Sequence, residues 1–137
     1  MATRAMIGVQ LPDGKVRAVY SHFDGYPEYL GMVLYTQYQD MDVVESLCSY
    51  PIRTIKPDGV PEYLDNEDTY HTYDSPADYY TEAEAMYGVE YLYLLSEAGW
   101  EVYSVDNESL DSLESLVEEI MENEKTRDWF AKVGLDF

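Results

Sequence analysis

The residues best suited to chemistry are the two histidines, because each is followed closely by an aspartate. His22 stands two positions before Asp24, and His71 stands three positions before Asp74. An imidazole beside a carboxylate can act as an acid–base pair, and two such pairs brought together can hold a metal ion. One hypothesis is therefore a small metal-dependent or acid–base enzyme that uses these four side chains.

The same two motifs are also typical of turns, and this is the interpretation we prefer. In it, Asp24 and Gly25 shape a loop, Tyr26 and Pro27 lead into a helix, and His22 hydrogen-bonds to backbone across the turn. The sequence contains neither a glycine-rich phosphate loop nor a nucleophile elbow. We therefore expect no catalytic residue, no metal ion and no cofactor.

Charge is the strongest signal in the composition. The chain has 137 residues, with 28 Asp and Glu against 8 Lys and Arg, and its formal net charge is −20. Residues 57–124 hold twenty acids and no Lys or Arg, whereas residues 1–56 hold six acids and five bases. Acids that only increase solubility, or that adapt a protein to high salt, would be spread over the whole chain. Their concentration in one part of the chain therefore favours a functional acidic surface.

The composition also excludes several classes of protein. An acidic chain repels phosphate and anionic lipid, so we expect no direct binding to nucleic acid or to a membrane. The hydrophobic content of 46% can form a core, and no apolar run is long enough to span a membrane. The N-terminus lacks the apolar region of a signal peptide, and the single cysteine, Cys48, lies in an apolar stretch typical of a buried residue. We expect a cytoplasmic protein.

Turn signals and apolar spacing predict regular structure in the first part of the chain. The predicted elements are strands over 4–11 and 15–21, a helix over 28–39, a second short helix, and a strand over 52–55. The second helix can be capped by Asp40 or by Asp42.

The later part combines an irregular segment with a second hairpin. The predicted elements are a loop over 57–83, strands over 87–95 and 100–105 joined by a turn at 96–99, and helices over 108–123 and 125–133. Asp106 or Asn107 caps the first of these helices, whose expected buried residues are Leu110, Leu113, Leu116, Val117, Ile120 and Met121. Together the elements predict one α+β domain over 1–137, with an antiparallel sheet built from two hairpins, helices packed on one face and a long acidic, tyrosine-rich loop.

The opening of the chain carries a series of motifs: Ile7-Gly8, Asp13-Gly14-Lys15-Val16, Tyr20-Ser21-His22-Phe23-Asp24-Gly25-Tyr26-Pro27, and Gly31 with Leu34. This series resembles a family of small, uncharacterised bacteriophage proteins. A later element, His71-Thr72-Tyr73-Asp74-Ser75-Pro76, is similar too. The family more often has tryptophan where this chain has Phe23. The resemblance implies a phage origin and leaves the mechanism open.

The leading hypothesis is an acidic interaction protein that mimics the charge of nucleic acid. Its partner would be a basic, nucleic-acid-binding host protein, which it would inhibit during host takeover or defence evasion in the cytoplasm of the infected cell. Tyrosines among the acids suit such a protein-binding surface. The expected partner-binding residues are Asp65, Glu67, Asp68, Asp74, Asp78, Glu82, Glu84, Glu108, Asp111, Glu114, Glu118, Glu119 and Glu122.

Two further alternatives stay open at this point. Besides the enzyme built on His22, Asp24, His71 and Asp74, the chain could be a phage structural or assembly protein whose acidity only keeps it in solution. The apolar content also allows a homodimer, which would lengthen an acidic surface.

Overall fold

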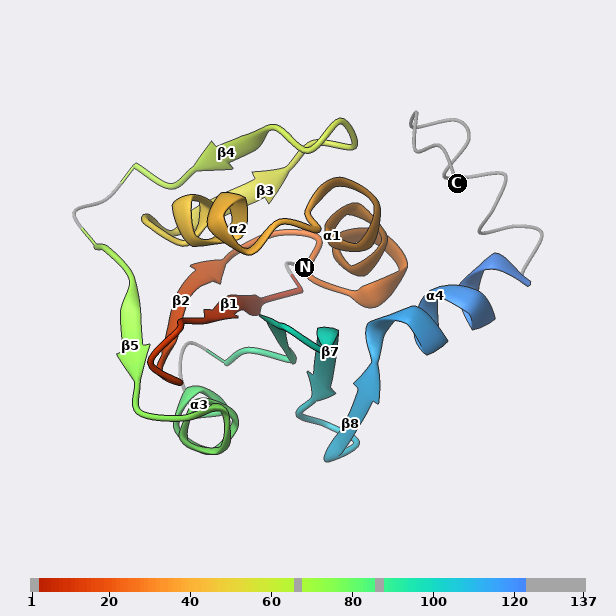
Figure 1. Cartoon of the computed structure of the whole chain (residues 1–137). Coiled ribbons are helices and arrows are strands. Elements are labelled where there is room, and N and C mark those ends of the chain that lie inside the picture. Colours follow the sequence, from red (N-terminus) through yellow and green to blue (C-terminus); the bar gives the residue numbers. More distant parts are fainter. Residues whose placement is uncertain (1–2, 66–67, 86–87, 123–137) are drawn as a thin grey trace.

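Both predicted hairpins are present, and they lie side by side in one sheet (Figure 1). A computed structural model describes residues 3–65, 68–85 and 88–122. In this part of the chain the strands are β1 (Ala5–Gln10), β2 (Val16–Ser21), β3 (Ile52–Ile55), β4 (Pro61–Tyr63), β5 (His71–Tyr73), β6 (Tyr91–Ser96), β7 (Gly99–Ser104) and β8 (Ser109–Ser112). Their order is β4-β3-β2-β1-β6-β7-β8, and β5 pairs with β2 outside this path.

The sheet is mixed, so the prediction of an antiparallel sheet made only from two hairpins is wrong. The two hairpins join through β1 and β6, which are parallel, with Ala5 opposite Tyr91. The β2 and β3 strands also meet in parallel, where Ser21 faces Ile52. Parallel strands need a long crossover, and the chain makes the one between β2 and β3 through helices. The α+β class is confirmed.

Helices cover both faces of the sheet, which corrects the prediction that they pack on one face. On the first face lie the π-helical turn η1 (Pro27–Gly31), α1 (Met32–Gln37), α2 (Met41–Leu47) and α4 (Leu113–Met121). They bury the larger core, which includes Leu34 and Trp100. On the opposite face α3 (Pro76–Ala83) buries Tyr79 in a second core with Met6 and Leu92. None of the described helices has the length and apolarity to cross a membrane.

The helices of the first half begin where the sequence predicts. In place of the helix predicted over 28–39, η1 covers Pro27–Gly31 and α1 covers Met32–Gln37, so the helical segment ends two residues earlier than expected. Of the two candidate caps for α2, Asp40 is the one used, because its Oδ1 accepts hydrogen bonds from the backbone N–H of Asp42, at 2.8 Å, and of Val43, at 3.4 Å. These bonds satisfy amides that the first helical turn leaves without partners.

The predicted loop over 57–83 contains β4, β5 and α3, so its description as an irregular loop is wrong. Helix α3 starts at an N-cap serine followed by proline, a pattern that is visible in the sequence. The Ser75 Oγ accepts a hydrogen bond from the backbone N–H of Asp78 at 3.1 Å, and Pro76 occupies the first helical turn. Only Tyr79 and Ala83 are buried in this short helix, so its apolar periodicity is too brief to identify it.

The predicted helix over 108–123 begins five residues later than expected, because its first part is strand β8. A turn in which the Glu108 N–H donates to the Val105 carbonyl oxygen at 3.4 Å returns the chain along β7, so Asp106 and Asn107 belong to this turn and cap no helix. Leu110, predicted to be buried, is 51% exposed. Leu113 and Val117 are buried, and Leu116, Ile120 and Met121 are partly buried against the core. The predicted helix over 125–133 lies outside the described residues.

Candidate functional site

The two histidine motifs lie beside different parts of β2: His22 directly follows the strand, and His71 begins β5, which pairs with its first half. His71 is the register partner of Ala18, which lies four residues before His22, so the two positions are about 13 Å apart along the strand. Asp74 follows the other end of β5, beyond the pair of Tyr73 with Val16. The four side chains therefore do not meet in one site. Among the described residues, no group of three or more His, Cys, Asp or Glu could hold a metal ion.

The segment from His22 onward acts as a structural turn that fastens β2 to β3. The backbone N–H groups of His22 and Phe23 donate to the carbonyl oxygens of Ile52 and Arg53, each at 2.9 Å. The His22 ring shares a 2.6 Å hydrogen bond, through Nδ1, with the Tyr20 hydroxyl. These contacts match the turn interpretation of the motif, with the backbone bond made by the main chain of His22 and the side chain held by a tyrosine.

Gly25, in the same turn, lies too close to the N-terminal segment to carry a side chain. A Cβ at this position would lie 2.8 Å from both the Ala5 Cβ and the Thr3 carbonyl oxygen. We expect Gly25→Ala to lower the free energy of unfolding by about 1–3 kcal/mol, as overpacking does in tight sites. Urea denaturation checks this, and an unchanged midpoint would show that the turn can shift without loss.

Cys48 is a buried structural residue, as expected from the sequence. Its thiol donates to the Ile7 carbonyl oxygen at 3.3 Å. Burial raises the pKa of Cys48 to about 12, and the nearby Arg17 offsets only part of that effect. A thiol of this kind stays protonated at neutral pH and is a poor nucleophile.

The predicted acidic residues separate into groups on different sides of the molecule. Helices α3 and α4 pack on opposite faces of the sheet, so their carboxylates do not share a face. Asp65 and Asp68 lie between β4 and β5, and Asp74 follows β5, on the side of the sheet away from β8. Asp78 and Glu82 are exposed on α3. Glu67 lies outside the described residues.

The largest group surrounds the edge strand β8. Residues 88–122 hold ten acids and no Lys or Arg, and they form the neighbouring elements β6, β7, β8 and α4. We define the acidic end as the carboxylates on β7, on β8 and its preceding turn, on α4 and its C-cap, and at the end of α3: Glu84, Glu101, Glu108, Asp111, Glu114, Glu118, Glu119 and Glu122. In the described ranges, none of these carboxylates lies within ion-pair distance of a Lys or Arg nitrogen.

Two tyrosines connect α3 to the acidic end. The Tyr80 hydroxyl donates to Glu101 Oε2 at 3.0 Å, and the Tyr80 and Tyr103 rings lie 5.6 Å apart. Burial raises the pKa of Tyr103, and the charges of Glu84 and Glu108 raise it further. Glu101 was not among the expected partner-binding residues, although its alternation with Trp100 and Val102, which face the first core, places it on the opposite face of β7, beside the second core.

Four of the five described Lys and Arg residues lie on or beside β2 and β3, and the fifth, Arg4, precedes β1 and lies next to Gly88. Arg17, on β2, lies 3.7 Å over the Tyr70 ring and donates to the Cys48 carbonyl oxygen and to Ser49 Oγ. Lys56, which follows β3, lies 3.8 Å from Glu62. The molecule is therefore electrically asymmetric across its sheet, with a negative edge at β8 and mixed charge near β2 and β3.

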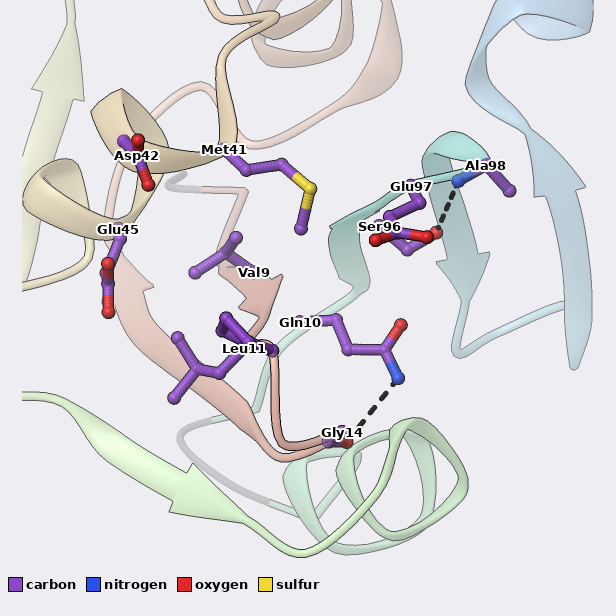
Figure 2. Close-up of a pocket in the computed structure, with 11 residues that line it drawn as sticks. Val9, Gln10, Leu11, Gly14, Met41, Asp42, Glu45, Ser96, Glu97 and Ala98 are labelled. Carbon is purple, nitrogen blue, oxygen red and sulfur yellow. Dashed lines mark hydrogen bonds between the residues drawn. The ribbon is translucent and has the colours of Figure 1, made fainter.

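Two hollows open on either side of Ala98, at the tip of the hairpin between β6 and β7. The first has a volume of about 480 Å³, and Figure 2 shows Met41 reaching into its middle above Val9. The second has a volume of about 280 Å³ and includes Trp100 and Glu114 in its lining. Sequence patterns could not reveal these hollows, because each is assembled from segments distant in the chain.

No protein-family model, curated protein or solved structure matches this chain. The resemblance to small bacteriophage proteins therefore stays a prediction.

Proposed function

We propose that the protein is an acidic interaction protein of bacteriophage type, which mimics nucleic-acid charge and inhibits a basic, nucleic-acid-binding host protein in the host cytoplasm. The observation that carries the proposal is the acidic end, where eight carboxylates surround β8 and have no Lys or Arg ion-pair partner among the described residues. Like charges gathered in this way repel one another and lower stability, so their concentration at one edge favours a role in binding.

The spacing of carboxylates on α4 is close to that of phosphates in one DNA strand. Glu114, Glu118, Glu119 and Glu122 span eight residue steps, which is about 12 Å along a helix axis. The mean axial step between successive charges is therefore about 4 Å, and the phosphates of one DNA strand follow one another at about 3.4 Å along the duplex axis. Leu113 and Val117 face the core, so the acids occupy the outward side of the helix.

A basic cleft that binds DNA could therefore accept this edge through charge alone. Association would be fast at low salt and would weaken as salt screens the charges. The proposal assigns no bond-making or bond-breaking step to the protein. It also excludes Asp65, Asp68 and Asp74 from the contact surface, because they lie away from the acidic end.

Displacement of proteins from DNA tests this proposal. Bacterial lysate is adsorbed on DNA-cellulose at low salt, and the column is washed with the purified protein or with polyglutamate at equal total charge. We expect the protein to release one or a few basic proteins that polyglutamate leaves bound, and mass spectrometry would identify them. Release of the same set by both washes, or of none, would contradict the proposal.

A further inference from the structure

The first hollow combines an apolar floor with an acidic rim. Its apolar lining includes Val9, Leu11 and Met41, and its carboxylates are Asp42 and Glu45 from α2 and Glu97 from the hairpin tip. In Figure 2 the two acids of α2 lie on one side of Met41 and Glu97 lies on the other. None of the described residues that line it is Lys or Arg.

This lining selects the chemistry of an occupant. An anionic ligand would be repelled by the three carboxylates, and a purely apolar ligand would remove them from water without giving them a partner. An arginine or lysine side chain satisfies both parts of the surface, because its aliphatic stem can lie on apolar groups while its charged end reaches carboxylates. A volume of about 480 Å³ falls within the range of pockets that bury a ligand.

We infer that this hollow binds a basic peptide segment of the partner protein, with an arginine or lysine side chain lying on Met41 and Leu11. Its cationic end pairs with Asp42 and Glu45, and Glu97 on the other side of the hollow adds to the negative potential that attracts it. The inference rests on the proposed function for the identity of the partner as a basic protein, and it adds the place where a single side chain of that partner is recognised.

The second hollow continues the surface toward the acidic end. Both hollows include Ala98 in their lining, and the second also includes Tyr35, Trp100 and Glu114. Because Glu114 belongs to the acidic end, a bound segment that crosses the hairpin tip from the first hollow to the second would extend toward α4. A side chain that follows the basic residue would then meet the aromatic rings of the second hollow.

Local hydrogen bonds shape the rim of the first hollow. The Ser96 Oγ accepts from the backbone N–H of Ala98 at 3.2 Å, and the Gln10 Nε2 donates to the Gly14 carbonyl oxygen at 3.4 Å (Figure 2). Each of these bonds joins two residues of the same wall and fixes the local shape of that wall. The hollow therefore needs little rearrangement before it binds a side chain.

Peptide binding followed at the Met41 methyl group tests the inference. The probe is an N-acetylated, C-amidated peptide of alternating leucine and arginine, five residues long, titrated into protein labelled with ¹³C at the methionine methyl groups. We expect a saturable shift of the Met41 signal, with smaller changes at the fully buried Met6 and Met32. A peptide with glutamate in place of arginine should leave Met41 unmoved.

Two matched triple variants separate the hollow from general charge. D42N/E45Q/E97Q removes the rim, and we expect the peptide to bind about tenfold more weakly. E62Q/D65N/D74N removes the same charge at positions outside the lining of the hollow and should bind within about twofold of the wild type, since exposed charges that do not contact the peptide are screened. Equal weakening in both variants, or saturation without a Met41 shift, would overturn the inference.

The outcome is independent of the DNA-displacement experiment. A saturable shift of the Met41 signal would support the hollow as a peptide-binding site even if the protein displaces nothing from DNA. The lack of displacement would contradict the proposed function. If D42N/E45Q/E97Q displaces proteins from DNA as well as the wild type does, the result would support a role for the acidic end. It would overturn the inference that this hollow binds the partner protein.

Discussion

Replacing Tyr79 with alanine should lower the free energy of unfolding by about 3–5 kcal/mol, the range for removing a large aromatic side chain from a core. Tyr79 is fully buried, and its ring lies 5.3 Å from those of both Tyr73 and Tyr80. It is the larger of the two side chains that α3 buries fully in the second core, the other being Ala83. Because small domains are stable by about 5–15 kcal/mol, this loss is a large share of the total.

The matched control is Tyr79→Phe, which keeps the ring and removes only the hydroxyl. That hydroxyl donates to the Tyr93 carbonyl oxygen at 2.8 Å, so its loss should reduce stability by about 1 kcal/mol. Urea denaturation of both variants gives the two values. Similar losses for alanine and phenylalanine would show that the ring contributes little, which would contradict the role of α3 as a packed cover of this face.

Stability should also fall steeply above pH 9. Burial raises the pKa of Cys48 from 9.0 to about 12, and it raises the pKa of Tyr79 and of Tyr93 well above 10. Each group thus keeps its proton in the folded chain at a pH where the unfolded chain has lost it. The stabilising contribution is complete below the unfolded pKa and is lost as pH rises toward the folded pKa.

For Cys48 alone, the loss between pH 9 and pH 12 is about 4 kcal/mol, at about 1.4 kcal/mol for each pH unit. Urea unfolding at intervals from pH 7 to pH 11 measures the slope. Cys48→Ala should be less stable at pH 8 but should lose stability more gradually between pH 9 and pH 11. A variant slope equal to that of the wild type would mean that the thiol ionises freely in the fold.

The second core contacts the acidic end, so the Tyr79→Ala substitution should also affect the proposed binding surface. Tyr80, the neighbour of Tyr79, carries the hydrogen bond to Glu101, and Glu84 follows α3 at its C-cap. Loss of the Tyr79 anchor would loosen the part of the acidic end that lies on this face. Helix α4 packs over the other core, so its carboxylates should be unaffected.

Local signals predicted the elements that depend on neighbouring residues. The Asp13-Gly14 turn, the Asp40 cap and the strands of both hairpins follow from short stretches of sequence. The parallel pairing of β1 with β6 could not be predicted in this way, because it depends on how distant segments pack. Helix α3 was missed for a related reason, since most of its stability comes from contacts of Tyr79 with the sheet.

The sequence shows where the acids lie along the chain, but it predicts only part of their arrangement in the folded protein. The absence of Lys and Arg between residues 57 and 124 is visible in the sequence. A single acidic face would require α3 and α4 to lie on the same side of the sheet. They pack on opposite faces instead. Strand β8 decides the outcome, because it turns residues 109–112 into a sheet edge around which seven of the expected carboxylates gather with Glu101.

The most direct measurement of the central claim compares two charge-matched variants in binding to the protein released from DNA. E114Q/E118Q/E122Q removes three carboxylates from the acidic end, and E62Q/D65N/D74N removes three from elsewhere. We expect the first to weaken binding at least about tenfold and to flatten the dependence of affinity on salt, while the second keeps affinity and slope close to those of the wild type. Equal losses in both variants, or no loss in the first, would contradict the claim that this protein acts through its acidic end.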